Sequence, residues 1–396
     1  MKLSGTPLFR FLALYAVLYA GFGVQSPYLP SLLQSRNLLP GAIALVLAAG
    51  TAIRLLAGPA AGRIADRLDA PRSVFSVCAG AAALIVLGYL PAQGLWLLLI
   101  VGLLQSAALA PLAPVCDTLA LGSAAPRRAD DPGAPDFSYG WVRGAGSAAF
   151  IVGSILSGAV IAQLGITAVV WLNASLLAAA GLAAQAVPVL LPQRQPRAPA
   201  SIAAGHVSAI GVLLGLPLYR RVVFLAALIL GSHAMHDGFT VIRWSAAGIS
   251  PAIAGVLWSQ SVAAEVVIFL FLGRPLLNWV GPAGAVMIAA AAGIVRWATM
   301  AETASLAALA AVEPLHGLTF ALLHLTCMQL LAECVPQHLS ATALTLYGTV
   351  GIGGPTALLT LASGPLYGHF GAHGFWVMAA FCAAALPLVP GLKRAR

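Results

Sequence analysis

Charged residues are scarce in this chain of 396 residues. Only 8% of its residues are Asp, Glu, Lys or Arg, whereas a soluble domain carries about a quarter. Hydrophobic residues make up 60% of the chain, and the mean hydropathy is +0.95. This composition excludes a soluble protein and predicts a polytopic membrane protein whose helices occupy nearly the whole length.

Cysteine is also rare, and the sequence motifs of ATP-driven pumps and of enzymes are absent. The five cysteines are odd in number, and none falls in a predicted external loop, so we expect small buried side chains and neither a disulfide set nor a metal site. The chain has no Gly-x4-Gly-Lys-Ser/Thr loop, which argues against an ATP-driven pump. It shows no nucleophile–base pair either, and we therefore expect a protein that is not an enzyme and needs no cofactor.

The chain is rich in long apolar stretches. Twelve are long enough to span a bilayer. The first begins after Lys2 and Arg10 and continues to Leu33 without a small-residue cleavage site before Pro27, so it is interpreted as an uncleaved helix. The predicted spans are 8–33, 41–61, 73–91, 95–122, 138–162, 166–190, 219–245, 251–272, 282–301, 304–332, 339–367 and 372–390. The fold class predicted is an all-α membrane protein of twelve helices.

The basic residues fall mainly on one side of these spans. With the N-terminus inside, the inner side receives most Lys and Arg, and the outer side receives Arg36 and Arg243. Positive loops stay in the cytoplasm, so both termini are predicted to be cytoplasmic in a multi-pass membrane protein. The net charge of +9 is spread over short loops, which excludes a nucleic-acid surface.

The two halves of the chain look related. Tyr139-Gly140-Trp141-Val142 recurs as Tyr347-Gly348-Thr349-Val350, and two further glycine motifs recur at nearly the same offset. This pattern predicts a duplicated six-helix unit. The predicted domains are an N-terminal bundle over 1–190, a cytoplasmic linker over 191–218 that is rich in Pro and Ala, and a C-terminal bundle over 219–396.

The segment after the second span carries the sequence Gly62-Arg63-Ile64-Ala65-Asp66-Arg67. It resembles the loop signature of the major facilitator superfamily, although Ala70-Pro71 replaces a later glycine of that signature. The resemblance implies a gating loop with Gly62, Asp66 and Arg67, in which the aspartate caps a helix end and pairs with an arginine across the two halves to hold the outward-open state. The alternative is a solvated loop that serves topology alone.

Asp117 and Arg143 form the first intramembrane pair that the sequence predicts. Each lies about six residues inside a span, on either side of a charged loop (Arg127, Arg128, Asp130, Asp131 and Asp136), which places both roughly 8–9 Å from one face. Opposite charges at matching depth can neutralise each other. The pair is either purely structural or serves substrate or coupling.

The second half contains more buried ionisable groups. Glu265 and Arg296 lie at depths that their long side chains could bridge, and His316 falls near the middle of its helix, where a histidine could exchange a proton. His233, His236 and Asp237 are spaced to share one helix face. They could present metal ligands, but no matching ligand set accompanies them, and no metal is expected. Glu313 stays unassigned.

Several stretches resemble the phenylpropionate permease family within the major facilitator superfamily, a relative of the lactose-permease and nucleoside-permease branches. They include Pro111–Pro114 before Asp117, Tyr139–Arg143, Ala264-Glu265-Val266, Gly293–Trp297 and Leu315–Phe320. The resemblance implies substrate roles for Asp117 and Arg143, proton coupling through Glu265, Arg296 and His316, and cavity-lining aromatics that include Tyr19 and Trp258. The carboxylate that lactose permeases carry three residues after the histidine is Thr319 here, which leaves Glu265 as the expected proton carrier.

We therefore expect a monomeric secondary transporter in the lipid bilayer, driven by the proton gradient. The hypothesis is proton symport of a small organic anion such as 3-phenylpropionate, bound by Asp117, Arg143, Arg296, Trp258 and Tyr19, with Glu265, His316 and Asp237 coupling the proton. A carrier of a sugar, a nucleoside or exported hydrophobic compounds is the alternative. A membrane receptor or membrane enzyme is a third, and no extramembrane domain supports it.

Overall fold

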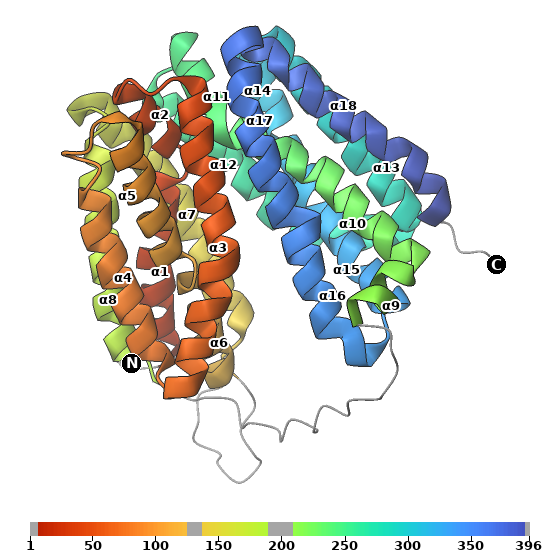
Figure 1. Cartoon of the computed structure of the whole chain (residues 1–396), viewed down its shortest axis with the longest axis horizontal. Helices are drawn as coiled ribbons and strands as arrows, with labels where there is room; N and C mark the ends of the chain where they lie inside the picture. Colours follow the sequence, from red (N-terminus) through yellow and green to blue (C-terminus); the bar gives the residue numbers. More distant parts are fainter. Residues whose placement is uncertain (1–6, 125–136, 189–208, 393–396) are drawn as a thin grey trace. The chain divides into compact units, whose positions relative to one another are not determined.

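The computed structural model describes residues 7–124, 137–188 and 209–392, and within these ranges the secondary structure is helical (Figure 1). The chain splits into two compact units. The first comprises residues 1–32 and 53–203, and the second comprises residues 33–52 and 204–396. The predicted charged loop at 127–136 and most of the predicted linker lie outside the described residues.

Nine helical segments of the described residues are long and apolar enough to cross a membrane. Two of them are very long, Pro251–Glu302 and Gln337–Leu392, and each contains a glycine with positive φ, Gly281 at 70° and Gly371 at 54°. Such a φ is not helical, so these glycines interrupt the runs. The all-α membrane fold is confirmed, whereas the number of twelve spans stays a prediction.

The first unit packs its helices along their lengths (Figure 1). Its helices are α1 (Pro7–Gln25), the first half of α2 (Leu29–Ser35), the part of α3 (Pro40–Leu68) from residue 53 onward, α4 (Pro71–Leu87), α5 (Gly94–Leu109), α6 (Leu112–Ala124), α7 (Tyr139–Leu164) and α8 (Ala168–Ala186). Helices α1 and α7 approach closely because Gly23 and Gly153 face the backbone of the other helix. Ser154 Oγ donates to the Gly23 carbonyl at 3.0 Å and fixes this contact. Small residues allow such close helix packing in membranes.

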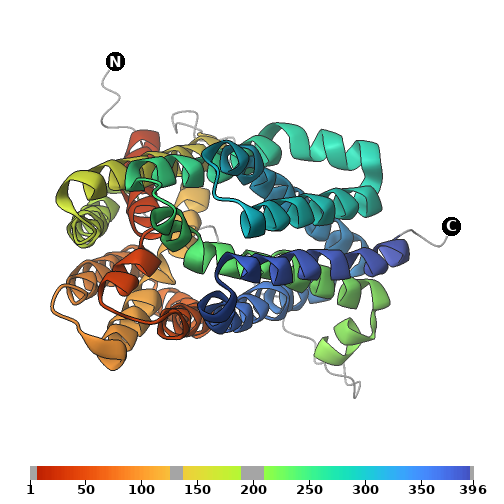
Figure 2. The same cartoon turned by 90° about the horizontal axis from the view of Figure 1, so that it is seen from above.

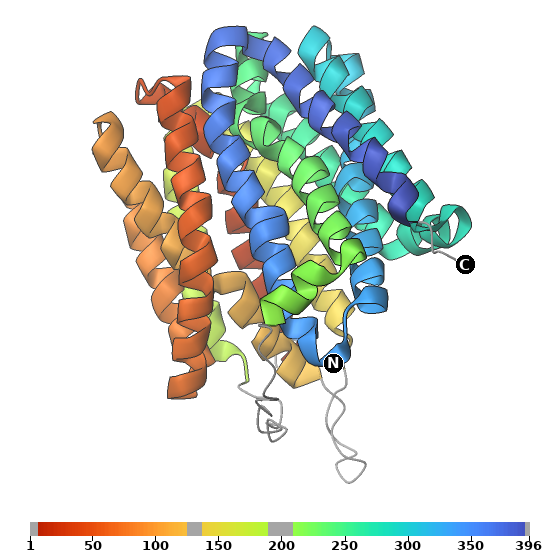
Figure 3. The same ribbon diagram turned by 45° about the vertical axis from the view of Figure 1, so that its right-hand side comes forward.

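The second unit contains more interrupted helices (Figure 2). Its α-helices are α9 (Ala209–Gly215), α10 (Pro217–Ile229), α11 (Ala234–Ala246), α12 (Pro251–Val267), α13 (Gly273–Glu302), α14 (Leu306–Val312), α15 (Leu323–Cys334), α16 (Ser340–Leu346), α17 (Gly354–Phe370) and α18 (Phe375–Ala385). Helix α10 runs between α17 and α18 (Figure 3). Short 3₁₀ turns precede α11 (η2, Gly231–His233) and follow α14 (η4, Glu313–Leu315).

Three π-helical turns interrupt the second unit: η3 (Ile268–Leu272), η5 (Gly317–Leu322) and η7 (Tyr347–Gly353). Such turns are rare and occur frequently at functional sites. Two of them, η3 and η5, pack against each other. Gly317 opens η5 where a Cβ would overlap the backbone of Ala264 on α12. The π turn therefore brings α12 and the helix that carries His316 into close contact.

The predicted gating loop is not a loop in the structure. Helix α3 continues to Leu68, so Gly62, Asp66 and Arg67 lie on its last turns, and α4 begins at Pro71. The turn between them uses Asp69 at φ 49°. Asp66 lies near the C-terminal end of α3, and the capping and pairing roles that the motif implies for it stay predictions.

Candidate functional site

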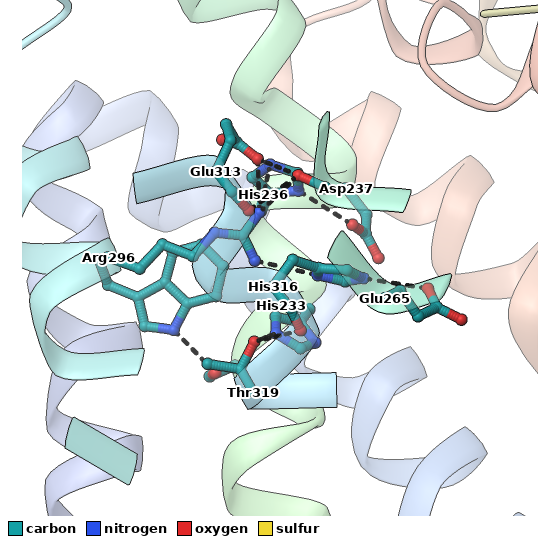
Figure 4. Close-up of polar contacts among 11 residues, drawn as sticks. His233, His236, Asp237, Glu265, Arg296, Glu313, His316 and Thr319 are labelled. Atoms are coloured by element: carbon teal, nitrogen blue, oxygen red, sulfur yellow. Dashed lines mark hydrogen bonds and ion pairs between the residues drawn. The ribbon is translucent and has the colours of Figure 1, made fainter. Parts of the chain in front are cut away.

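Arg296 on α13 is the centre of a buried polar cluster in the second unit (Figure 4). Its Nη2 lies 2.7 Å from Oε2 of Glu313 on η4, and both side chains have no exposed surface. Ser261 on α12 also donates its hydroxyl to this carboxylate, and the guanidinium lies 4.5 Å from the ring of Trp297. A buried charge of this kind is tolerated when it is paired and hydrogen-bonded, and Glu313 supplies that partner.

His236 on α11 connects this buried pair to the surface of the unit. Its Nε2 lies 3.2 Å from Oε1 of Glu313 and 3.1 Å from Nη2 of Arg296. Its Nδ1 lies 3.2 Å from Oδ1 of Asp237, whose side chain is 57% exposed. Trp258 stacks on the imidazole at 5.0 Å between ring centroids. His236 therefore bridges an exposed carboxylate and a fully buried one.

His316 connects Arg296 to Glu265 on the other side of the guanidinium (Figure 4). Its Nδ1 lies 3.1 Å from Nη1 of Arg296, and an arginine can only donate. Nδ1 of His316 must therefore accept, and the neutral ring carries its proton on Nε2. That nitrogen faces Oε2 of Glu265 at 3.5 Å. A second proton on Nδ1 would point at the guanidinium, so the geometry disfavours a doubly protonated His316.

Thr319 fixes the position of the His233 ring. Its hydroxyl donates to the carbonyl of His316 at 3.2 Å, and Oγ1 lies 2.9 Å from Nε2 of His233. Because the hydroxyl has only one proton, His233 donates from Nε2. Thr319 stands where lactose-permease relatives are expected to carry a carboxylate, and here it orients two histidine-bearing segments.

Five ionisable residues gather around the Arg296 guanidinium. We call His236, Asp237, Glu265, Arg296, Glu313 and His316 the Arg296 cluster. Each of its three carboxylates contacts the guanidinium or an imidazole. Ionisable groups inside a membrane protein are costly and often belong to proton relays. Asp237 and Glu265 are the carboxylates of the cluster that keep exposed surface.

A second polar group lies in the first unit around Asp117 on α6. Its Oδ1 accepts from the hydroxyl of Tyr15 at 2.5 Å and from that of Tyr139 at 2.9 Å. Tyr15 stacks on Tyr19 with ring centroids 5.6 Å apart, and the guanidinium of Arg143 lies 4.8 Å from the Tyr19 ring. Asp117 and Arg143 are therefore connected through tyrosines, and Arg143 is exposed.

The structure changes two pairings that the sequence suggested. Arg296 pairs with Glu313 and not with Glu265, because the 3₁₀ turn η4 presents Glu313 to α13. Asp117 binds tyrosine hydroxyls where an ion pair with Arg143 was expected. Asp237, Trp258 and His316 do gather around Arg296, while Tyr19 and Arg143 lie in the other unit.

Glu313 and His236 are the members of the cluster that received no site role from the sequence. The available signal was that an intramembrane carboxylate needs a partner, and Glu313 lies three residues before His316. The helix face shared by His233 and His236 was a possible metal site. Within the described ranges, no group of three or more His, Cys, Asp or Glu side chains could hold a metal ion; the histidines contact Thr319, Glu313 and Arg296.

Comparisons with known proteins agree with this architecture. The model of the MFS_1 like family matches residues 8–378. A protein of Escherichia coli K12 named "Probable 3-phenylpropionic acid transporter" is 32% identical over 96% of this chain and 97% of its own. A maltose permease of Geobacillus stearothermophilus is 24% identical over 97% of this chain and 92% of its own. The crystal structure of a point mutant of the nucleoside transporter NupG matches with a TM-score of 0.83 at 16% identity, covering 98% of this chain and 100% of that one.

Proposed function

This chain belongs to the MFS_1 like family and is a multi-pass membrane transporter rather than an enzyme, and we propose that it takes up a small organic anion together with protons. The proposed cargo is an aromatic carboxylate of the 3-phenylpropionate type. Transporters of this family need no cofactor, and the proton gradient supplies the energy. Both termini are proposed to be cytoplasmic, on the bias of Lys and Arg among the loops.

The contact between His316 and the carboxyl group of Glu265, beside the buried Arg296, is the observation that carries this proposal. A proton on Glu265 removes one carboxylate charge from the cluster, and Nε2 of His316 faces that carboxyl group at 3.5 Å. Loss of the proton restores the charge. If one conformation of the carrier is favoured when Glu265 is protonated and the other when it is deprotonated, binding and release of the proton are coupled to the conformational change.

Arg143 is proposed as the anchor of the anionic cargo. Arg296 is fully buried and already bound to Glu313, so it is poorly placed to receive a substrate carboxylate. Arg143 is exposed, and it lies over the ring of Tyr19. A guanidinium binds a carboxylate in a bidentate way, and Tyr19 adds an aromatic surface beside it. The name of the Escherichia coli relative supports an aromatic carboxylate as cargo.

The test is uptake of radiolabelled 3-phenylpropionate into right-side-out membrane vesicles that contain the protein. We expect uptake with an imposed inward proton gradient and its collapse with a protonophore. Vesicles without the protein are the first control, and labelled maltose and uridine are matched neutral cargoes. Gradient-independent uptake of 3-phenylpropionate would refute symport, and transport of only the neutral solutes would refute the anionic cargo.

A further inference from the structure

We propose that His324 on α15 is a further proton-transfer station, which receives the proton of Glu265. This inference deepens the proposed function, because it rests on proton symport. Nothing in the family resemblance assigns His324 a role. The proposal starts from a row of rings along one helix.

His316, Phe320 and His324 follow one another at intervals of four residues, and the π turn η5 between them still leaves their rings in one row. The rings of His316 and Phe320 stack with centroids 5.5 Å apart and 9° between planes. The rings of Phe320 and His324 stack at 6.3 Å and 8°. The two imidazoles are thus in register and are separated by one phenyl ring.

Helix α12 and its π turn η3 provide the opposite side of this row. Phe269 lies 6.4 Å from the ring of Phe320 and 6.1 Å from that of His324. Glu265 precedes Phe269 by four residues and contacts His316. Glu265 on α12 and Phe269 on η3 therefore both meet the ring row, and the Glu265 carboxyl lies at its His316 end.

His324 lies where it can receive a proton that leaves Glu265. Nδ1 of His316 accepts from Arg296, so His316 does not pass a proton on toward the guanidinium. His324 is half-buried and lies among the rings of Phe320, Phe269 and Tyr347. Glu265 on α12 interacts electrostatically with its imidazole, and a nearby carboxylate favours an imidazolium.

The proposed step is a proton transfer. The O–H bond of the Glu265 carboxylic acid breaks, and an N–H bond forms on the unprotonated nitrogen of His324, either by rotation of Glu265 or through one relaying water molecule. A carboxylate and an imidazolium result, and the imidazolium, whose ring is half-buried, then releases its proton to water. Phe320 must move for this transfer, so its ring acts as a barrier between the two stations.

The first experiment compares two transport modes in proteoliposomes with labelled 3-phenylpropionate. Gradient-driven accumulation requires the carrier to release its proton, whereas equilibrium exchange does not. We expect His324→Gln to lower accumulation about 100-fold, the lower end of what general acid–base groups contribute, and to leave exchange unchanged. His369→Gln, at an exposed histidine, is the matched control and should change neither mode. Normal accumulation in His324→Gln, or equal loss of both modes, would overturn the proposal.

A second experiment does not depend on the cargo. Phe320→Leu removes the ring between the imidazoles, so we expect an imposed pH gradient to decay faster without substrate. Adding His324→Gln to this variant should abolish the leak, and adding His369→Gln should not. A leak that persists in Phe320→Leu/His324→Gln, or no leak in Phe320→Leu, would overturn the role of His324. A leak that depends on His324, in a protein that does not transport 3-phenylpropionate, would support this inference while refuting the proposed cargo.

Discussion

Replacement of Glu313 by glutamine removes the carboxylate that neutralises Arg296 in the interior of the second unit. Both side chains are fully buried, and their charged atoms are 2.7 Å apart. Breaking a buried ion pair by removing one partner costs about 3–5 kcal/mol, because the remaining charge is uncompensated. For a unit of about 200 residues, each kcal/mol lowers the unfolding temperature by about 2–4 °C, which gives a loss of roughly 6–20 °C.

The assay is thermal unfolding of the purified protein in detergent, followed by tryptophan fluorescence. Asp237→Asn is the matched control, because it removes a carboxylate of the same cluster whose side chain is 57% exposed. An exposed pair contributes about 0–1 kcal/mol, so its shift should stay below about 4 °C. The double variant Glu313→Gln/Arg296→Gln should regain part of the loss, since no buried charge is left unpaired. Equal shifts for Glu313→Gln and Asp237→Asn would refute the reasoning.

Three further predictions concern the first unit. Arg143→Gln should raise the KM for 3-phenylpropionate about 10–100-fold, as expected for loss of a charged hydrogen bond worth about 1.5–3 kcal/mol, and an unchanged KM in vesicle uptake would exclude Arg143 as the anchor. Tyr15→Phe should lower the unfolding temperature, because Asp117 loses the donor at 2.5 Å; calorimetry in detergent checks this, and an unaltered midpoint would contradict it. Gly153→Val should prevent recovery of a monodisperse protein in size-exclusion chromatography, because the added side chain would overlap the backbone of Ala20. Gly144→Ala should behave as the wild type, because a Cβ at this position meets open space.

The membrane class and the helical fold could be predicted from composition and apolar length alone. The bilayer requires helices whose backbone groups are satisfied internally, and a chain with 8% charged residues has few other options. The same requirement identified the buried ionisable residues, since each had to be paired or to face water. Arg296 and His316 were recognised in this way, and both lie in the cluster that the structure shows.

The pairing of these residues could not be predicted from depth along ideal helices. The 3₁₀ turn at Glu313–Leu315 and the π turn at Gly317–Leu322 change the rise and rotation around His316. An estimate that uses 1.5 Å per residue throughout therefore assigned Arg296 the wrong partner. The tyrosines around Asp117 come partly from α1, about a hundred residues away in sequence, and no local pattern reveals such a contact.

The end of the second predicted span, at residue 61, was also placed too early. Gly62 and the charged residues after it suggested a loop, but Ala60, Ala61 and Ala65 are strong helix formers, and α3 continues to Leu68 before the turn at Asp69. Pro71 then begins α4 at the first helical position, where its fixed φ is favourable.

The central claim is that Glu265 carries the proton that moves with the substrate. The most direct test records the pH inside proteoliposomes with a pH-sensitive dye while 3-phenylpropionate is added outside. We expect acidification with the wild-type protein, and no acidification with Glu265→Gln, although the variant still exchanges labelled for unlabelled substrate. Substrate-dependent acidification by Glu265→Gln at the wild-type rate would contradict the account.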